Sequence, residues 1–200
     1  MNQTSHSQMT QGLAGLVLAA GASTRLGRPK QLVLYRRLTL IEHVVNHALE
    51  YCGAGLIVVT GAYREQVNKA LGGLPVETIY NPDWQEGMGS SVRTGVMRID
   101  RDCRAIMLML CDQPTISRAD LSSLVNAWTS RPEHIAAAEY AGTCGVPAIF
   151  PKSFREDLLC LSGEQGAKRI INGAPCISTV KIPSAEFDVD TTDDLGTLNS

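Results

Sequence analysis

Short apolar runs of strand length alternate along this chain with segments of helical period, and this alternation limits the fold more than any other feature. The first run, residues 16–20, is apolar throughout and stops at Gly21, as a strand buried on both faces does. The predicted strands cover residues 16–20, 56–60, 76–80, 105–110, 135–140, 146–150 and 177–181. The predicted helices cover residues 40–52, 64–71, 90–99, 118–129, 153–161, 166–172 and 192–198. Repeated strand–helix units with short connections predict one α/β domain with a mostly parallel sheet and helices on both faces.

Length and composition are those of an ordinary globular protein. The 200 residues include 18 basic and 20 acidic side chains, and the net charge of −2 predicts no extended positive surface for nucleic acid or an anionic membrane. The longest apolar run, residues 13–20, is too short to span a membrane, and the polar N-terminus lacks the features of a signal peptide. The 6 cysteines contain no CxxC pair and fit a reducing compartment. We therefore expect a cytoplasmic protein in which residues 1–12 form a flexible tail and residues 13–200 form one domain.

The loop after the first predicted strand has the composition of a phosphate-binding loop. Small residues leave the strand, and Arg25, Arg28 and Lys30 follow within ten positions of Gly21. Small side chains let backbone N–H groups approach an anion, and Arg25 and Lys30 can neutralise phosphate oxygens. The loop is neither a Walker A motif nor GxGxxG, because the spacing of Gly21 and Gly27 fits neither. A solvated basic surface loop is the alternative.

Two further loops should meet the first one, because ligands of open parallel sheets bind at the carboxyl ends of the strands. Asp112 directly follows the most apolar predicted strand, and a carboxylate there suits Mg²⁺, which takes one or two protein carboxylates and completes its shell with water and phosphate. A capping role in the turn is the alternative for Asp112. In the loop after Tyr80, Ser90 or Ser91 is expected to cap the next helix, and amides and hydroxyls there suit the edge of a nucleobase.

Two other arrangements are weaker candidates for chemistry. His43 and His47 are four residues apart on a predicted helix, but no glutamate follows His43 as an HExxH metal site requires, so a helix surface is favoured over a metal site. Cys111 has no histidine near it in the sequence and is interpreted as a small buried apolar residue rather than a nucleophile.

Several motifs together resemble the MobA-like nucleotidyltransferases, and most closely the molybdenum cofactor cytidylyltransferase branch. Residues 18–30 are similar to the pattern L-A-[AG]-G-x-S-x-R-x-G-x-x-K of that family. The other matching segments are Pro29-Lys30-Gln31-Leu32, Gly87-Met88-Gly89-Ser90-Ser91, Cys111-Asp112-Gln113-Pro114, Gly145-Val146-Pro147-Ala148, Leu161-Ser162-Gly163-Glu164-Gln165-Gly166-Ala167 and Asp188-Val189-Asp190-Thr191-Thr192-Asp193-Asp194-Leu195. The resemblance implies a single Rossmann-like three-layer domain of the nucleotide-diphospho-sugar transferase type.

The same resemblance implies roles for individual residues. It implies that Arg25 and Lys30 hold the triphosphate, that Asp112 binds Mg²⁺ and that Asp190 is a second metal carboxylate. Besides Arg25 and Lys30, the residues implied to hold the nucleotide are Leu18, Ala19, Ala20, Gly21, Ser90 and Ser91. The pattern L-A-A-G is typical of the cytidylyl branch, and Ser91 is similar to a serine that contacts cytosine. Glu164 departs from the family, which usually has Asp there, so the acceptor side of the site is less defined.

The leading hypothesis from the sequence is transfer of CMP from CTP to a molybdopterin-type acceptor with release of pyrophosphate, with Mg²⁺ as cofactor and a molybdoenzyme as a further expected partner. One alternative keeps the fold and changes the substrate to GTP or to a sugar or polyol phosphate. Another is a non-catalytic chaperone that delivers the cofactor to a molybdoenzyme. An oxidoreductase on this scaffold lacks support, because the chain has no dinucleotide-binding fingerprint.

Overall fold

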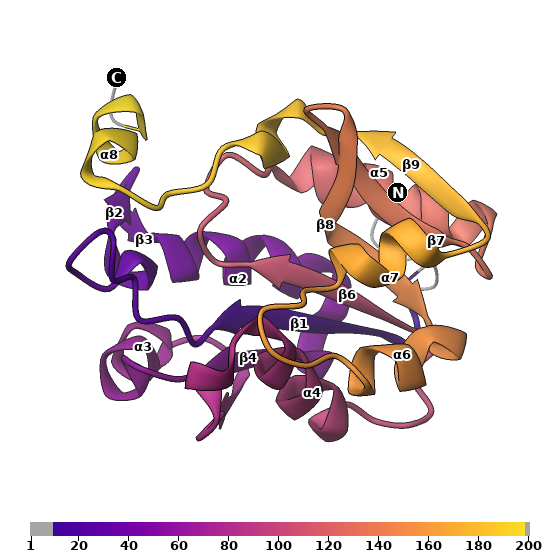
Figure 1. The fold of residues 1–200 in the computed structure, drawn as a ribbon, viewed down its shortest axis with the longest axis horizontal. Coiled ribbons are helices and arrows are strands. Elements are labelled where there is room, and N and C mark those ends of the chain that lie inside the picture. The colour runs from indigo at the N-terminus through magenta and orange to yellow at the C-terminus, as the bar shows by residue number, and fades with distance from the viewer. Residues whose placement is uncertain (1–9, 199–200) are drawn as a thin grey trace.

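The computed structural model describes residues 10–198 and has a seven-stranded sheet at its centre (Figure 1). The strand order is β5-β4-β1-β6-β8-β7-β9. Strand β8 runs antiparallel to its neighbours β6 and β7, and the other neighbouring pairs are parallel, which confirms the predicted mostly parallel sheet. The strands are β1 Leu13–Ala19, β4 Leu56–Thr60, β5 Glu77–Tyr80, β6 Ala105–Leu110, β7 Ile135–Tyr140, β8 Thr143–Pro151 and β9 Ile177–Lys181.

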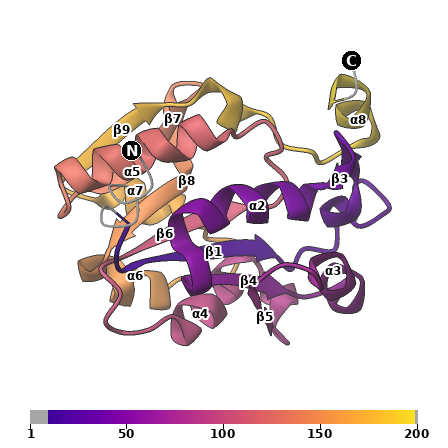
Figure 2. The same cartoon turned by 180° about the vertical axis from the view of Figure 1, so that it is seen from behind.

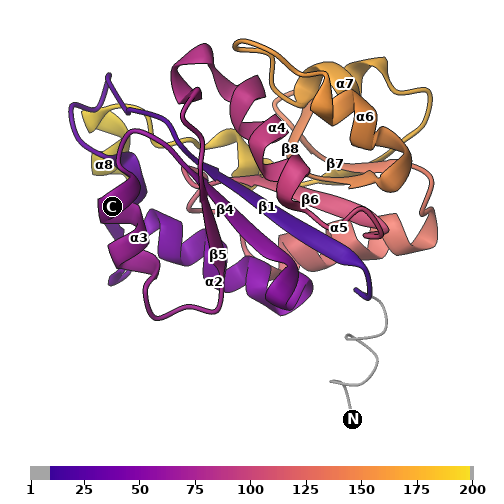
Figure 3. The same ribbon diagram turned by 90° about the horizontal axis from the view of Figure 1, so that it is seen from below.

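Helices cover both faces of this sheet, as predicted, and make three layers (Figures 2 and 3). Helices α2, α3 and α5 pack on one face in one apolar cluster, and α4, α6 and α7 pack on the other face in a second cluster. A short hairpin of β2 and β3 and the helix α8 lie on the side of the molecule where β1 ends (Figure 1). The bounds are α2 Leu40–Cys52, α3 Arg64–Leu71, α4 Met88–Arg98, α5 Arg118–Ser130, α6 Arg155–Leu159, α7 Lys168–Gly173, α8 Thr192–Leu198, β2 Leu34–Tyr35 and β3 Leu38–Thr39.

Capping side chains set where two of the helices begin. Thr39 and Glu42 form the predicted capping box of α2, in which each side chain satisfies a backbone N–H of the other residue. Ser117 caps α5 in the same way with Asp120. Helix α2 therefore begins directly after β3, and α5 begins at the end of the loop that follows β6.

The structure corrects the predicted start of α4. We expected Ser90 or Ser91 at the N-cap, but the helix begins at Met88 and its N-cap is Gly87, which has a positive φ of 112°. Glycine tolerates this backbone conformation, so the N-cap lies three residues before Ser90 and four before Ser91. Both serines consequently lie inside the helix, where they are buried.

The remaining expectations concern the N-terminal tail and membrane spans. Most of the predicted tail, residues 1–12, lies outside the described residues. Within the described part of the chain, no helix combines the length and apolar character needed to cross a membrane.

Candidate active site

A cavity of about 300 Å³ opens at the carboxyl ends of β1 and β6. The loop after β1, the segment around the start of α4 and the residues after β6 contribute its walls. The residues that line it are Leu18, Ala19, Ala20, Gly21, Ala22, Lys30, Gln31, Trp84, Gln85, Gly87, Met88, Ser91, Leu110, Cys111, Asp112 and Glu164. Of the residues expected to hold the nucleotide, all but Arg25 and Ser90 line this one cavity.

The loop after β1 is held in shape by its own polar contacts. The buried amide of Gln31 donates from Nε2 to the carbonyl oxygens of Ala19 (3.1 Å) and Gly21 (2.8 Å). Ser23 Oγ accepts from the backbone N–H of Lys30 at 3.1 Å and so closes the loop on itself. The position of a Cβ on Gly21 has no atom within 4 Å, so the loop faces open space there. A fixed, small-residue loop beside open space is what a phosphate group requires.

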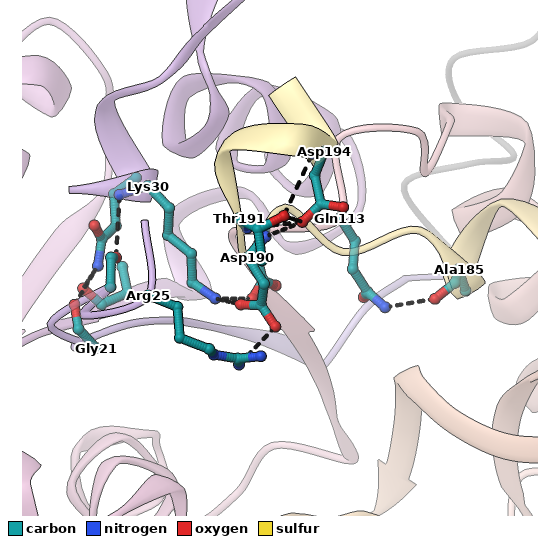
Figure 4. A network of polar contacts seen from close by, with 12 residues as sticks. Gly21, Arg25, Lys30, Gln113, Ala185, Asp190, Thr191 and Asp194 are labelled. Atoms are coloured by element: carbon teal, nitrogen blue, oxygen red, sulfur yellow. Dashed lines mark hydrogen bonds and ion pairs between the residues drawn. The ribbon is translucent and has the colours of Figure 1, made fainter. Parts of the chain in front are cut away.

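Lys30 is the centre of a charge cluster at the edge of this cavity (Figure 4). Its Nζ donates to Asp112 Oδ2 at 2.5 Å and to Asp190 Oδ1 at 2.8 Å. Arg25 donates to the other oxygen of Asp190, also at 2.8 Å. The Arg25 side chain is 72% exposed and the Lys30 side chain 17% exposed, so Arg25 lies at the solvent side of the cluster. The cluster therefore joins residues that were predicted to act on one triphosphate.

The electrostatics of the cluster keep Lys30 and Asp190 charged. Burial alone would lower the pKa of Lys30, but the charge and hydrogen bond of Asp112 and the hydrogen bond of Asp190 outweigh burial and raise it. Burial would raise the pKa of Asp190, but the hydrogen bonds and charges of Lys30 and Arg25 lower it. The pKa of neighbouring Asp188 is raised to about 6 by burial and by the negative charge of Asp112.

The carboxylates of Asp112 and Asp190 come together because the segment before α8 lies along the end of β6. The backbone N–H of Val189 donates to the carbonyl oxygen of Asp112 at 2.9 Å. Asp194, in the first turn of α8, accepts from the backbone N–H groups of Asp190 (3.0 Å) and Thr191 (2.7 Å). These contacts hold the backbone of Asp190 beside Asp112, although the two residues are far apart in the sequence.

The pair of carboxylates suits a divalent metal ion. Asp112 Oδ2 binds Lys30, while Oδ1 is buried and has no hydrogen-bond partner among the described residues. An unpartnered buried carboxylate oxygen is costly, and a cation would satisfy it. Asp112 and Asp190 are two carboxylates, and residues 10–198 hold no group of three or more His, Cys, Asp or Glu side chains placed for a metal. Such a sparse oxygen donor set fits Mg²⁺ or Mn²⁺ shared with phosphate.

Ser90 and Ser91 differ in what they can reach. Ser91 lines the cavity, and its Oγ accepts from Asn81 Nδ2 at 3.0 Å. Ser90 is directed into the protein, where its hydroxyl contacts the carbonyl oxygens of Asp83 and Gly87. This placement argues against the predicted nucleotide contact of Ser90, because the hydroxyl is already engaged and only 1% of the residue is exposed.

A second glycine-rich segment, residues 161–167, packs on the start of α4 and places Glu164 in the cavity wall. The backbone N–H of Gly89 donates to the carbonyl oxygen of Gly163 at 2.9 Å. A Cβ on Gly89 would lie 2.7 Å from the backbone nitrogen of Ser162, so only glycine allows this approach. Two motifs that are distant in the sequence therefore form one wall of the site.

Gln31 and Asn81 are site residues that the sequence did not single out. Gln31 supports the loop after β1, and Asn81 holds both serines of α4. Gln31 directly follows Lys30, a residue already expected at the site, and Asn81 directly follows a predicted strand. These two positions were the signals in the sequence that could have identified them.

The model of the MobA-like NTP transferase domain matches residues 15–179, most of the chain. This chain belongs to the MobA-like nucleotidyltransferase family. The family agrees with the resemblance inferred from residues 18–30, and the observed seven-stranded α/β domain is of the nucleotide-diphospho-sugar transferase type.

Three proteins are similar to this chain over more than nine-tenths of its length. A nicotine blue oxidoreductase of Paenarthrobacter nicotinovorans is 30% identical over 92% of this chain and 94% of its own length. The Rv0371c homologue of Mycobacterium sp. strain JC1 is 32% identical, with a TM-score of 0.78 over 94% of both chains. Rv0371c of Mycobacterium tuberculosis in complex with manganese is 28% identical, with a TM-score of 0.72 over 93% of this chain and 97% of its own.

Proposed function

We propose that this nucleotidyltransferase transfers CMP from CTP to the terminal phosphate of a molybdopterin-type acceptor and releases pyrophosphate. The observation that carries the proposal is the meeting of Asp112 and Asp190 on the ammonium of Lys30 at the edge of the cavity. Two carboxylates and two cations at the mouth of a small-residue loop are the parts that a metal-bound triphosphate needs.

The loop after β1, Lys30 and Arg25 have distinct roles in binding the nucleotide. The loop from Leu18 to Gly21 contacts the nucleotide through its backbone. Lys30 neutralises phosphate oxygens as a point charge, and Arg25 does so as a planar fork from the solvent side. The ammonium of Lys30 lies within hydrogen-bond distance of both carboxylates. When a phosphate group binds, a small movement of the ammonium would replace a carboxylate contact with a phosphate contact.

Asp112 and Asp190 would hold a divalent ion, and the manganese complex of the related Rv0371c supports this assignment. A bound Mg²⁺ would supply charge neutralisation at the phosphate oxygens and fix their orientation. Oδ1 of Asp112 has no partner among the described residues, whereas a metal ion at Asp190 would share oxygens that contact Lys30 and Arg25.

The reaction needs positioning rather than a covalent intermediate. A phosphate oxygen of the acceptor attacks the α-phosphorus of CTP, a new P–O bond forms, and the bond from that phosphorus to the bridging oxygen breaks. The electron pair leaves with pyrophosphate. Lys30 and Arg25 stabilise the charge that develops on the leaving oxygens, and holding both reactants in one cavity removes much of the entropic barrier.

Ser91 and Ala20 support cytosine as the base. Ser91 Oγ accepts from Asn81 and keeps its own proton for donation, which suits the carbonyl oxygen of cytosine. Ala20 belongs to the L-A-A-G stretch that is typical of the cytidylyl branch, and this stretch is closely packed from behind, because a Cβ on Gly61 would lie 2.4 Å from the Ala20 carbonyl oxygen.

A pyrophosphate-release assay with purified molybdopterin-type cofactor, Mg²⁺ and each of the four nucleoside triphosphates tests the proposal. We expect release with CTP that depends on the acceptor. Release with GTP instead would reassign the base, and release with a sugar or polyol phosphate would reassign the acceptor. Cofactor binding without pyrophosphate release from any nucleotide would contradict the proposal and favour a carrier.

A second candidate function follows from the similarity to a nicotine blue oxidoreductase, which extends over nearly the full length of both chains. An enzyme of that kind would consume a reduced donor and would not cleave CTP. Oxidation of NADH or NADPH by the protein in the presence of a conjugated dye, with no pyrophosphate formed, would support this candidate and exclude the first.

A further inference from the structure

Helix α2 presents three polar side chains at intervals of four residues, and all three contact backbone carbonyl oxygens. His43 Nε2 contacts the carbonyl oxygen of Tyr35, His47 Nδ1 contacts that of Ile116 at 3.1 Å, and Tyr51 Oη donates to that of Arg118 at 2.8 Å. Spacing by four residues places them on one face of the helix. The histidine pair therefore fastens neighbouring segments to α2.

The His47 contact acts on the segment that carries Asp112. This segment runs from Asp112 to the start of α5, and on one side it is fastened to the chain before α8, through Val189 N–H to the Asp112 carbonyl oxygen and Thr115 Oγ1 to the Ser184 carbonyl oxygen. On the other side, His47 fastens it to α2 through Ile116.

The start of α2 is hydrogen-bonded to the segment that directly follows Lys30 and Gln31. The backbone N–H of Leu40, the first residue of α2, donates to the carbonyl oxygen of Val33 at 2.9 Å. The contact between His47 and Ile116 thus joins the half of the site that holds Lys30 to the half that holds Asp112. Asp112 has one oxygen on Lys30 and one without a partner, so its position depends on its backbone.

The contact assigns one tautomer to His47. Burial is the main cause that lowers the pKa of His47, so the imidazole is neutral at neutral pH and carries one N–H. A carbonyl oxygen accepts only, so that proton is on Nδ1. His47 offers a single, directed donor to the loop behind Asp112.

We propose that His47 is a positioning residue that sets the distance between Asp112 and Lys30 by holding the Ile116 carbonyl oxygen. The inference rests on the proposed function, in which Asp112 binds the metal of a metal–nucleotide complex. Residues that orient a metal ligand typically change metal affinity or activity by about 10- to 100-fold when removed.

Three variants separate positioning from general stability. His47→Leu removes the donor, and His47→Asn restores an N–H donor near the position of Nδ1. Tyr51→Phe is the matched control, because it removes a hydrogen bond from the same face of α2 to Arg118, the first residue of α5, at the end of the segment that is most distant from Asp112. Each variant is measured for thermal stability, for Mn²⁺ binding to the protein alone, and for the Mn²⁺ concentration that half-activates pyrophosphate release from CTP.

We expect His47→Leu to weaken Mn²⁺ binding and raise the half-activating Mn²⁺ concentration by about 10-fold, with the KM for CTP changed less than about 3-fold. His47→Asn should recover most of both values, and Tyr51→Phe should lower thermal stability alone. Hydrogen exchange of residues 111–118 should be faster in His47→Leu. Unchanged Mn²⁺ binding in a folded His47→Leu variant, or failure of His47→Asn to recover it, would overturn the inference. If the wild-type protein releases no pyrophosphate, the proposed function fails, while Mn²⁺ binding and hydrogen exchange still decide the role of His47.

Discussion

Lys30 contacts one oxygen of each carboxylate that would hold a metal ion, so its positive charge should oppose metal binding. Lys30→Met removes the charge and keeps most of the apolar stem. The substitution should change metal affinity and turnover in opposite directions. Without nucleotide, the variant should bind Mn²⁺ more tightly than the wild type, because Asp112 and Asp190 lose their counter-charge. With nucleotide, it should turn over at least about 100-fold more slowly, because one preorganised phosphate contact is gone.

The size of the first effect follows from the geometry. Two unit charges about 4 Å apart attract by about 4 kcal/mol at an effective dielectric constant of about 20. Asp190 is 31% exposed and the buried ammonium has lost hydration, so screening and desolvation offset part of that attraction. A net change of about 2 kcal/mol remains, which corresponds to about 30-fold in the Mn²⁺ dissociation constant.

Isothermal titration with Mn²⁺ measures the affinity, and pyrophosphate release measures turnover. Lys69→Met, on the exposed side of α3, is the matched control for loss of one positive charge and should change neither value. Equal or weaker Mn²⁺ binding in folded Lys30→Met would refute the idea that lysine and metal share these carboxylates.

Three more predictions follow from other parts of the site. Asp112→Asn should lower turnover by at least about 100-fold without unfolding the protein, as measured by pyrophosphate release and circular dichroism. Gly89→Ala should lower the free energy of unfolding by about 1–3 kcal/mol in denaturant titration, because its Cβ would meet a backbone nitrogen of the neighbouring loop at 2.7 Å. A thiol reagent at pH 8 should label exposed Cys160 and Cys176 in the native protein and spare Cys111, whose pKa is raised by burial.

Substitutions at exposed or open positions serve as controls for the two variants. Asp102→Asn, on an exposed side chain, should leave turnover unchanged, and a wild-type rate in Asp112→Asn would remove that carboxylate from the reaction. Gly73→Ala, where a Cβ meets no atom within 4 Å, should not lower stability comparably. Rapid labelling of Cys111 in the native protein would show that the end of β6 opens to solvent.

Local sequence patterns were sufficient to predict most of the elements. The capping residues Thr39 and Ser117 set the starts of α2 and α5, because the side-chain contacts that cap a helix lie within a few residues. The placement of Asp112 beside the loop of Lys30 followed from the rule for open parallel sheets, since β1 and β6 are adjacent parallel strands.

Long-range contacts were not predictable from single residues. The pairing of Lys30 with Asp190 depends on the path of the chain from β9 to α8, and periodicity carries no information on that path. The early start of α4 depends on the positive φ of Gly87 and on contact with residues 161–167, which displaced the serines from the cap. The intervals of His43 and His47 matched a metal motif in part, but their contacts are with backbone oxygens.

The most direct test of nucleotidyl transfer is to follow CTP that is labelled in its α-phosphate. The protein, Mg²⁺ and molybdopterin-type cofactor are incubated with this nucleotide, and the products are separated. We expect the label to appear in the cofactor and one unlabelled pyrophosphate to form for each labelled product. Label that stays in CTP while a reduced nicotinamide donor is consumed, or label that appears only as free CMP, would contradict it.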